Sequence, residues 1–296
     1  MKRLSVIIVT YNSEKDIYDC LSSINQWSDI PLGELELIIV DNNSRNVDTM
    51  FEQLRSIYGS DIVLIKNTRN GGYGQGNNMG IRMATAPVVL IMNPDVRLLE
   101  PVLKTALDAF EENRDLSIYG MKQMLSATEP SRNSFSCAYT VNGYLQTFMT
   151  SFGNRYDKYF PRYMHFSGSC FFVRKEMFEQ IGLFDETIFM YGEEEDIHYR
   201  MRKIGFKHMV YNPKLHYLHL TKEREPNLTY ETKLLDVAIE QSKKKGFNVS
   251  ETIKNRLRNN TILLLRERIL VLFGKKDKRQ LNLLKEFRKE IVQRLK

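Results

Sequence analysis

Residues 4–13 are Leu-Ser-Val-Ile-Ile-Val-Thr-Tyr-Asn-Ser, an apolar run that passes directly into four polar residues. The run Leu4–Val9 is rich in β-branched side chains, which favours a short strand. Residues 14–24 follow with apolar side chains at helical spacing. The stretch therefore predicts a strand, a loop and a helix in that order.

The same alternation continues over the first hundred residues. Strands are expected at 35–40, 62–66 and 87–92, and helices at 47–58 and 76–85. The run 35–40 has no polar alternation, as expected for a strand that is covered on both faces. Strands that alternate with helices in this way predict an α/β fold with a parallel, doubly wound sheet.

A polar cluster follows each of the four predicted strands. These clusters are Thr10 to Ser13, Asp41 to Ser44, Asn67 to Asn77, and Asn93 to Asp95. In open α/β sheets the ligand crevice lies outside the carboxyl ends of the strands. We therefore expect the four clusters to converge on one cleft.

The pattern is less regular further along the chain. Helices are expected at 100–112, 175–181 and 193–204, and strands at 166–173, 207–211 and 215–220. Residues 126–162 have poor periodicity and are expected to form loops and small strands. From residue 229 onward the pattern is helical, with one apolar stripe formed by Leu281, Leu284, Phe287, Ile291 and Leu295.

Length and composition are those of an ordinary globular protein. The chain has 296 residues, of which 42% are hydrophobic and 27% charged, and the length predicts about two domains. This composition excludes collagen-like, low-complexity and fully disordered classes. The three cysteines, Cys20, Cys137 and Cys170, are too far apart for a disulfide framework or a cysteine zinc knuckle.

Positive charge is concentrated in the last quarter of the chain. Residues 1–225 hold 25 Lys and Arg against 28 Asp and Glu, a balance of −3, whereas residues 226–296 hold 18 against 8, a balance of +10. We therefore expect a first domain at 1–225 and a basic, amphipathic helical region at 226–296. A basic tail suggests an anionic surface such as phospholipid or nucleic acid, and the alternative is a solvated helical face.

Targeting signals are not evident in the sequence. The apolar run Val6–Val9 is too short for the core of a signal peptide, which favours a cytoplasmic location. The most apolar candidate for a membrane span, 262–273, is interrupted by Arg266, Glu267 and Arg268. Any association with a membrane is therefore expected to be peripheral.

The glycine-rich stretch 70–80 does not match a dinucleotide-binding fingerprint. In the spacing G-x-G-x-x-G, Gly72 and Gly74 require glycine where Asn77 stands, and the next register requires it at Met79. The mismatch disfavours a dehydrogenase. What remains is a loop that enters a helix, a place for a phosphate or ribose, or simply a tight turn.

Acidic and histidine residues supply candidate chemistry. Asp41 could accept a hydrogen bond from a base or ribose, or cap a helix, and Asp95 could bind a metal ion or belong to a turn. One member of the run 193–196 could act as a base while others pair with neighbouring arginines, although such runs also occur at solvated helix starts. If His216 or His219 meets Asp95 in space, the pair predicts a site for Mg²⁺ or Mn²⁺.

Taken together, six ordered motifs resemble the family 2 inverting glycosyltransferases, most closely their bacterial rhamnosyltransferase-like branch. The resemblance covers roughly residues 4–220. The motifs are Val6-Ile-Ile-Val-Thr-Tyr-Asn12, Ile39-Val-Asp-Asn-Asn-Ser44, the glycine-rich stretch Asn70 to Gly80, Leu90-Ile-Met-Asn-Pro-Asp95, Gly182-Leu-Phe-Asp-Glu186 and Tyr191-Gly-Glu-Glu-Glu-Asp196.

The resemblance implies a GT-A fold, a Rossmann-like mixed sheet, with the C-terminal helices as an extension, and a UDP- or dTDP-sugar donor. By similarity, Asp41 recognises the edge of uracil or thymine. Other residues implied to line the nucleotide-sugar site are Thr10, Tyr11, Asn12, Asn70, Gly72, Asn77, Asn93 and Asp95.

The resemblance also implies a divalent cation and a catalytic base. Asn93-Pro94-Asp95 stands where relatives have Asp-x-Asp, so Asp95 would carry Mn²⁺ or Mg²⁺, with His219 as the late histidine and His216 as its alternative. Glu194 occupies the position of the base, with Glu193 and Glu195 as alternatives. It would deprotonate an acceptor hydroxyl that attacks the sugar from the face opposite the diphosphate.

These implications define an expected enzyme, a hexosyltransferase of bacterial cell-surface polysaccharide synthesis. It would move rhamnose or another hexose to a lipid-linked glycan at the inner face of the cell membrane, with acceptor specificity in residues 126–162. The basic tail would rest on anionic lipid or form a homodimer interface. A nucleotide-binding transferase or dehydrogenase, and a nucleic-acid-binding module built on the tail, are the disfavoured alternatives.

Overall fold

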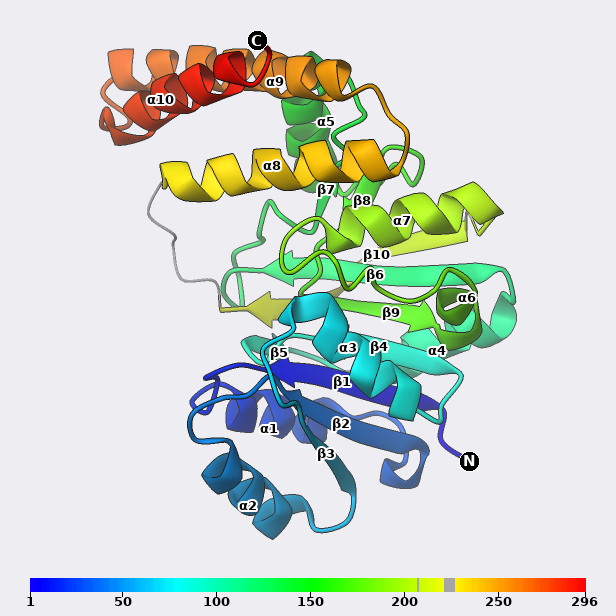
Figure 1. Ribbon diagram of the computed structural model, residues 1–296. Helices are drawn as coiled ribbons and strands as arrows, with labels where there is room; N and C mark the ends of the chain where they lie inside the picture. Colours follow the sequence, from blue (N-terminus) through cyan, green and yellow to red (C-terminus); the bar gives the residue numbers. More distant parts are fainter. Residues whose placement is uncertain (207, 221–226) are drawn as a thin grey trace. The chain divides into compact units, whose positions relative to one another are not determined.

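The structure is a computed structural model that describes residues 1–206, 208–220 and 227–296 (Figure 1). The chain divides into two compact units. The first contains residues 1–134 and 166–221, and the second contains residues 135–165 and 222–296. The C-terminal helices therefore share a unit with residues 135–165, a segment that the charge pattern assigns to the first domain.

The first unit is built on an eight-stranded sheet with the order β3-β2-β1-β4-β9-β6-β10-β5. Strand β1 pairs parallel with β2 and β4, with Thr10 of β1 opposite Asp41 of β2 and Ile8 of β1 opposite Met92 of β4. The strands are β1 (Leu4–Thr10), β2 (Leu35–Asp41), β3 (Ile62–Lys66), β4 (Val88–Met92), β5 (Val96–Leu98), β6 (Leu116–Met124), β9 (Cys170–Arg174) and β10 (His208–His219).

The sheet contains both parallel and antiparallel pairs, and β6 and β10 in its second half also pair parallel. Strands β3, β2, β1 and β4 run parallel, as the alternation of strands and helices predicts. Strand β9 then pairs antiparallel with both β4 and β6, and β5 pairs antiparallel with β10. The whole sheet is therefore mixed, which confirms the expected Rossmann-like mixed sheet.

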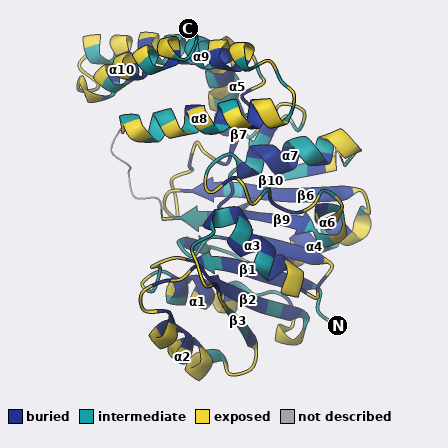
Figure 2. Ribbon diagram, in the orientation of Figure 1, coloured by how far each residue is buried: buried dark blue, intermediate teal, exposed yellow. Residues whose placement is uncertain are grey.

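Helices cover both faces of the parallel half. Leu4, Val6 and Ile8 share one apolar core with helices α1, α2 and α4, whereas Ile7 contacts Gly80 of α3 on the opposite face. The helices of the unit are α1 (Ile17–Trp27), α2 (Val47–Tyr58), α3 (Gly72–Met83), α4 (Leu103–Glu112), α6 (Lys175–Gln180) and α7 (Glu193–Ile204), with a short 3-10 turn at Leu32–Glu34. Figure 2 shows the resulting band of buried residues along the sheet.

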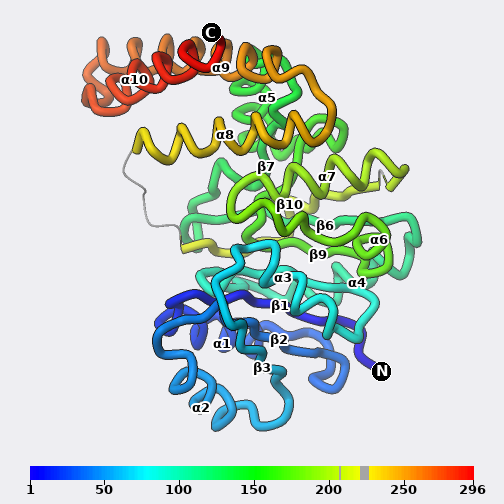
Figure 3. Tube along the Cα trace, in the orientation of Figure 1, coloured from blue at the N-terminus to red at the C-terminus, as the bar shows by residue number. Residues whose placement is uncertain are grey.

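The second unit is mainly helical. Figure 3 shows α5, in green, among the C-terminal helices, in yellow to red. The elements are β7 (Phe135–Cys137), α5 (Gly143–Tyr156), β8 (Met164–Phe166, whose last residue belongs to the first unit), α8 (Leu228–Lys244), α9 (Val249–Leu272) and α10 (Arg279–Gln293). The predicted apolar stripe of the last helix is confirmed, because Leu281, Leu284, Phe287 and Ile291 are buried and Leu295 packs against them.

Several expectations from periodicity are wrong. The predicted strand 166–173 is divided between the end of β8 and β9, and the helix predicted at 76–85 begins at Gly72 and ends at Met83. The stretch 126–162 contains a fourteen-residue helix, α5, where loops and small strands are expected. The segments 207–211 and 215–220 form one irregular strand, β10, whose pairing with β6 shifts register between Asn212 and His216, and Lys207 lies outside the described residues. Along the described part of the chain, no helix is long and apolar enough to span a bilayer.

Candidate active site

Asp41 joins the carboxyl ends of β1 and β2. Its side chain is fully buried, and its Oδ2 accepts hydrogen bonds from the hydroxyls of Thr10, at 2.8 Å, and Ser44, at 2.6 Å. Its Oδ1 accepts a third bond, from the backbone N–H of Ser44, at 2.7 Å. Asp41 is thus satisfied within the protein, and it fixes the loops that follow the two strands.

Those loops carry two of the other residues implied for the nucleotide. Tyr11 is exposed, and Asn12 adopts the left-handed conformation, with a φ of 51°. The backbone N–H of Asn12 donates to the Ser44 hydroxyl at 2.7 Å. Ser44 therefore couples Asn12 to Asp41, a role that the sequence motif alone does not reveal.

Buried amides hold the start of α3 against this edge. The Asn42 side chain donates to the carbonyl of Gly72 at 2.9 Å and accepts from the Asn67 side chain at 3.0 Å. The Asn70 side chain accepts from the N–H of Gly72 at 3.0 Å. Asn77 is buried, and within the described residues its Oδ1 has no hydrogen-bond partner. The predicted residues Asn70, Gly72 and Asn77 are therefore brought together at one helix start.

The segment before α7 packs on the same helix start. Gly72 has a φ of +86°, and a Cβ there would lie 2.1 Å from the carbonyl oxygen of Phe189. The N–H of Tyr73 donates to that carbonyl at 3.1 Å. Asn78 donates to the carbonyl of Phe184 and accepts from its N–H, both at 3.0 Å. Only glycine fits at position 72, and Asn78 anchors the segment that leads to α7.

Glu194 lies at the start of α7 and faces a second glycine. A Cβ on Gly168 would lie 2.1 Å from Glu194 Oε1, so the carboxylate occupies the space that a side chain would take. The hydroxyl of Tyr73 donates to the carbonyl of Gly168 at 2.5 Å. Helix α3, the turn before β9 and helix α7 therefore meet at the Glu194 carboxylate.

Burial raises the pKa of Glu194, while backbone N–H groups, including that of Gly168, oppose the rise. Burial and the adjacent Glu194 charge raise the pKa of Glu193 to about 8. At neutral pH Glu193 is therefore mainly protonated. Raised pKa values of carboxyl groups at a sheet edge are typical of groups that exchange protons with a substrate.

The other acidic residues of the run serve elsewhere. Asp196 pairs with Arg200, at 2.6 Å between Oδ2 and Nη2, and Glu195 is buried. The ring of His198 bonds the carbonyl of Glu194 at 2.7 Å through Nδ1. The geometry therefore favours Glu194 over Glu195 as a group that can meet a substrate.

Asp95 and His219 meet in space, with Oδ1 and Nε2 3.4 Å apart. The backbone supports the pair, since Leu220 N–H donates to the Asp95 carbonyl at 2.9 Å. His216 instead bonds Glu100, with 2.7 Å between Nδ1 and Oε1. Among the two histidines, only His219 is therefore placed beside Asp95.

The pair at Asp95 has the chemistry of a partial cation site. Ligands at about 2.0–2.2 Å from one ion lie roughly 3 Å apart at a right angle, and the observed 3.4 Å needs only a wider angle. His219 Nδ1 is buried without a hydrogen-bond partner in the described structure. Within residues 1–206, 208–220 and 227–296, no three His, Cys, Asp or Glu side chains form a metal cluster. Substrate oxygens or water would have to complete the coordination.

One hydrogen bond connects the turn of Asp95 to that of Gly168. The N–H of Asn93 donates to the carbonyl of Ser169 at 2.8 Å, and Met92 of β4 pairs with Cys170 of β9. Because β1, β2 and β4 are parallel, Asp41, Asp95 and the Gly168 turn lie at the same edge of the sheet. The predicted convergence of the strand ends is thus observed.

Comparison with known proteins agrees with this arrangement. Residues 5–182 match the model of glycosyl transferase family 2, which is more than half of the chain. The chain belongs to glycosyl transferase family 2. This confirms the resemblance on which the site residues were assigned.

Relatives of this family 2 chain are named as enzymes that transfer sugars. A low-salt glycan biosynthesis hexosyltransferase of Haloferax volcanii is 30% identical over 68% of this chain and 62% of its own length. An N-acetylglucosaminyl-diphospho-decaprenol L-rhamnosyltransferase of Mycobacterium tuberculosis is 26% identical, with 73% and 75% covered. TarS of Staphylococcus aureus, a poly(ribitol-phosphate) β-N-acetylglucosaminyltransferase, is 31% identical, with 41% and 21% covered. The chain thus spans 62% and 21% of the Haloferax and Staphylococcus relatives.

Solved structures confirm the fold. A mannosyltransferase from Pyrobaculum calidifontis, solved with GDP-Man and Mn²⁺, has a TM-score of 0.61 at 15% identity and covers 98% of this chain and 85% of its own. Residues 1–349 of S. aureus TarS give a TM-score of 0.57 at 14% identity, with 99% and 81% covered. The GT-A fold expected for this family 2 chain is therefore observed.

The raised pKa of Glu193 predicts a pH-dependent stability. Because the pKa of Glu193 in the folded state, about 8, lies above its usual value of 4.5, the contribution of Glu193 to stability is complete below about pH 4.5 and is lost as the pH rises through 8. In Glu193→Gln this titration is absent. We expect the Tm of the variant to rise relative to the parent by several degrees between pH 5 and pH 9, measured by calorimetry.

Glu186→Gln supplies the control for that series. Glu186 bonds Asn78 and Arg82, which lowers its pKa, so it is ionised throughout the range. Its Tm curve should run parallel to the parent curve above pH 5. If the Tm curve of Glu193→Gln also ran parallel to the parent curve, it would contradict the raised pKa of Glu193.

Proposed function

We propose that the chain is an inverting glycosyltransferase that moves a hexose from a nucleotide-diphosphate sugar to a hydroxyl of a glycan. The observation that carries this proposal is the Glu194 carboxylate, which stands against Gly168 at the sheet edge where the strand ends converge. Glu194 would accept the proton of the acceptor hydroxyl as that oxygen attacks the anomeric carbon, while the diphosphate departs from the opposite face. General-base catalysis of this kind contributes about 10²–10⁴-fold to the rate.

For the donor we propose a UDP- or dTDP-sugar, with rhamnose among the candidate hexoses because a relative is an L-rhamnosyltransferase. The exposed ring of Tyr11 offers a surface on which a base can stack. Asn12 and Thr10 lie beside it, and the start of α3 with Asn77 would face the ribose and phosphates. Since Asp41 already accepts three internal hydrogen bonds, we assign it to positioning these loops instead of reading the base.

A divalent cation, Mn²⁺ or Mg²⁺, fits beside Asp95 and His219. Mn²⁺ accompanies the donor in the Pyrobaculum structure, and the Asp95–His219 pair offers one oxygen and one nitrogen ligand. When bound, such an ion offsets the negative charge of the departing diphosphate. Asn93, which replaces a carboxylate in the motif, contributes its backbone N–H to the turn.

For the acceptor we propose a lipid-linked glycan of a bacterial cell surface, reached at the inner face of the membrane. The mycobacterial relative is named for a diphospho-decaprenol acceptor. Within the second unit, four exposed aromatic side chains, Tyr144, Phe148, Phe152 and Tyr156, form a ladder at i, i+4 spacing along α5. Phe148 and Phe152 stack with centroids 5.9 Å apart. This α5 ladder offers a flat surface for sugar rings.

Glu194→Gln should abolish transfer, because an amide cannot take up the proton. The loss expected is about 10²-fold or more in kcat, with the affinity for UDP unchanged in calorimetry. Gly168→Ala, whose Cβ would collide with the same carboxylate, should also lower kcat. The isosteric control is Glu193→Gln, which should retain activity; an inactive Glu193→Gln beside an active Glu194→Gln would reassign the base.

Asp95→Ala and His219→Ala should each weaken the Mn²⁺-dependent binding of UDP by more than about tenfold, because each removes one of two protein ligands. Thermal shift with UDP, with and without Mn²⁺, measures this without any turnover. His216→Ala is the matched control, since its ring bonds Glu100. A loss in His216→Ala equal to that in His219→Ala would move the cation site.

Phe148→Ala and Phe152→Ala should raise the KM for the glycan acceptor several-fold and leave the KM for the donor unchanged. Each ring contributes roughly 0.5–1.5 kcal/mol when it stacks. Leu145→Ala, also exposed on α5 but outside the ladder, is the control. Equal effects of all three variants on both constants would indicate a general loss of structure.

A further inference from the structure

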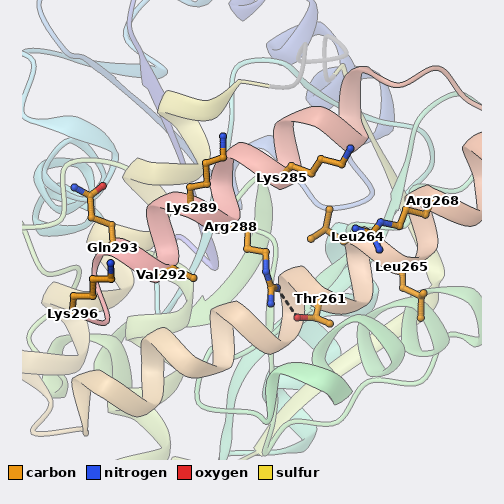
Figure 4. A pocket seen from close by; sticks show the side chains of 10 residues that line it. All are labelled: Thr261, Leu264, Leu265, Arg268, Lys285, Arg288, Lys289, Val292, Gln293 and Lys296. Carbon is orange, nitrogen blue, oxygen red and sulfur yellow. Dashed lines mark hydrogen bonds between the residues drawn. The ribbon is translucent and has the colours of Figure 1, made fainter.

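A groove of about 730 Å³ lies between α9 and α10 in the second unit. Figure 4 shows that its cationic side chains come from both helices, with Leu264, Leu265 and Val292 among them. The cations are Arg268 on α9, Lys285, Arg288 and Lys289 on α10, and Lys296 beyond the end of α10. The groove is therefore both basic and partly apolar.

The groove has no carboxylate to balance this charge. None of the side chains that line it is acidic. Arg288 donates to the Thr261 hydroxyl at 2.9 Å, and Lys289 pairs with Glu286, which is outside the lining, at 2.8 Å. Within the described ranges, no ion pair involves Arg268, Lys285 or Lys296. Several cations that converge without carboxylates favour a multiply charged anion such as a phosphate ester.

An exposed apolar stripe borders the groove. Leu265, Ile269, Leu272 and Phe273 lie on one face of the end of α9, with exposures of 56%, 47%, 82% and 70%. Leu265 also lines the groove, so the stripe and the cations are continuous. Contiguous exposed apolar side chains of this kind mark interaction surfaces.

We propose that α9 and α10 dock on a bilayer that contains anionic phospholipid. The groove binds the lipid phosphates, and the apolar stripe enters the boundary between headgroups and acyl chains. An amphipathic helix with cations beside a Leu and Phe face binds membranes in this way. The proposal rests on the proposed function only in that a lipid-linked acceptor gives membrane docking a purpose.

Charge and chemistry favour lipid over other occupants. Residues 135–165 and 227–296 together hold 21 Lys and Arg against 9 Asp and Glu, a balance of +12, so a second copy of this unit would be repelled. RNA would satisfy the cations, but its phosphates would leave Leu272 and Phe273 in water. An anionic bilayer satisfies both parts of the surface.

The test is co-sedimentation of the full chain with vesicles of phosphatidylcholine alone or mixed with phosphatidylglycerol. We expect binding only to the mixed vesicles. Each cation near an anionic surface contributes roughly fivefold in affinity, so the groove variant Arg268→Gln/Lys285→Gln/Lys289→Gln should bind about 100-fold more weakly. The matched control, Lys243→Gln/Lys244→Gln/Lys254→Gln, loses the same charge outside the groove and should retain most of the binding.

A second variant tests the stripe and does not depend on charge. Ile269→Ser/Leu272→Ser/Phe273→Ser changes exposed side chains, so it should keep the parent Tm while it loses the vesicle binding that survives at high salt.

Equal losses of vesicle binding in the groove and control variants would show that the groove is not the binding site. Equal thermal shifts with inorganic phosphate and with vesicles would identify a site for free phosphate. Two results would overturn the proposal if the parent chain does not bind vesicles. One is RNA binding that is lost in the groove variant, and the other is self-association that is lost in the stripe variant.

Docking and catalysis are measured separately. Transfer to a water-soluble acceptor should be unchanged in the groove variant. A chain that transfers sugar but does not bind anionic vesicles would contradict the proposed membrane docking and leave the proposed function intact. A chain that binds vesicles but transfers no sugar would contradict the proposed function alone.

Discussion

The parallel register of β1 between β2 and β4 is the constraint on which the rest of the first unit depends. Both faces of β1 are buried, with Leu4, Val6 and Ile8 on one side and Ile7 on the other. A slip of one residue would exchange the two faces, so packing specifies the register strongly. That register places Thr10 opposite Asp41, where their hydrogen bond holds the two loops that open the site.

The proposed proton transfer then depends on how the chain positions the neighbouring carboxyl groups of Glu193 and Glu194. Asn78 anchors the segment before α7, and the positive φ of Tyr191 and Gly192 turns the chain into that helix. Burial raises the pKa of both groups, and backbone hydrogen bonds to each of them oppose the rise. Glu194 differs from Glu193 in its position, because its carboxylate stands against Gly168 at the sheet edge.

The spacing of apolar residues in the sequence predicts those helices and strands whose apolar side chains are buried. Helices 47–58 and 193–204 have the predicted bounds, and all four parallel strands are where the apolar runs lie. Helix α5 was missed because its ladder of aromatic side chains points outward and Gly143 and Gly153 weaken the helical signal. The roles of Asn78 and Gly168 could not be predicted either, because their partners are distant in sequence; Phe184 lies 106 residues from Asn78.

The two units differ in charge in a way that suits their proposed ligands. Residues 1–134 and 166–221 hold 20 Lys and Arg against 25 Asp and Glu, and the site itself contributes Asp95 and Glu194. A nucleotide diphosphate brought to such a site meets like charge, which raises the cost of binding unless a cation intervenes. A divalent ion at Asp95 and His219, as proposed, would offset the negative charge of the whole first unit as well as use the ligand pair. The second unit has the opposite balance, because residues 135–165 and 227–296 hold 21 Lys and Arg against 9 Asp and Glu, and an anionic surface would offset the excess.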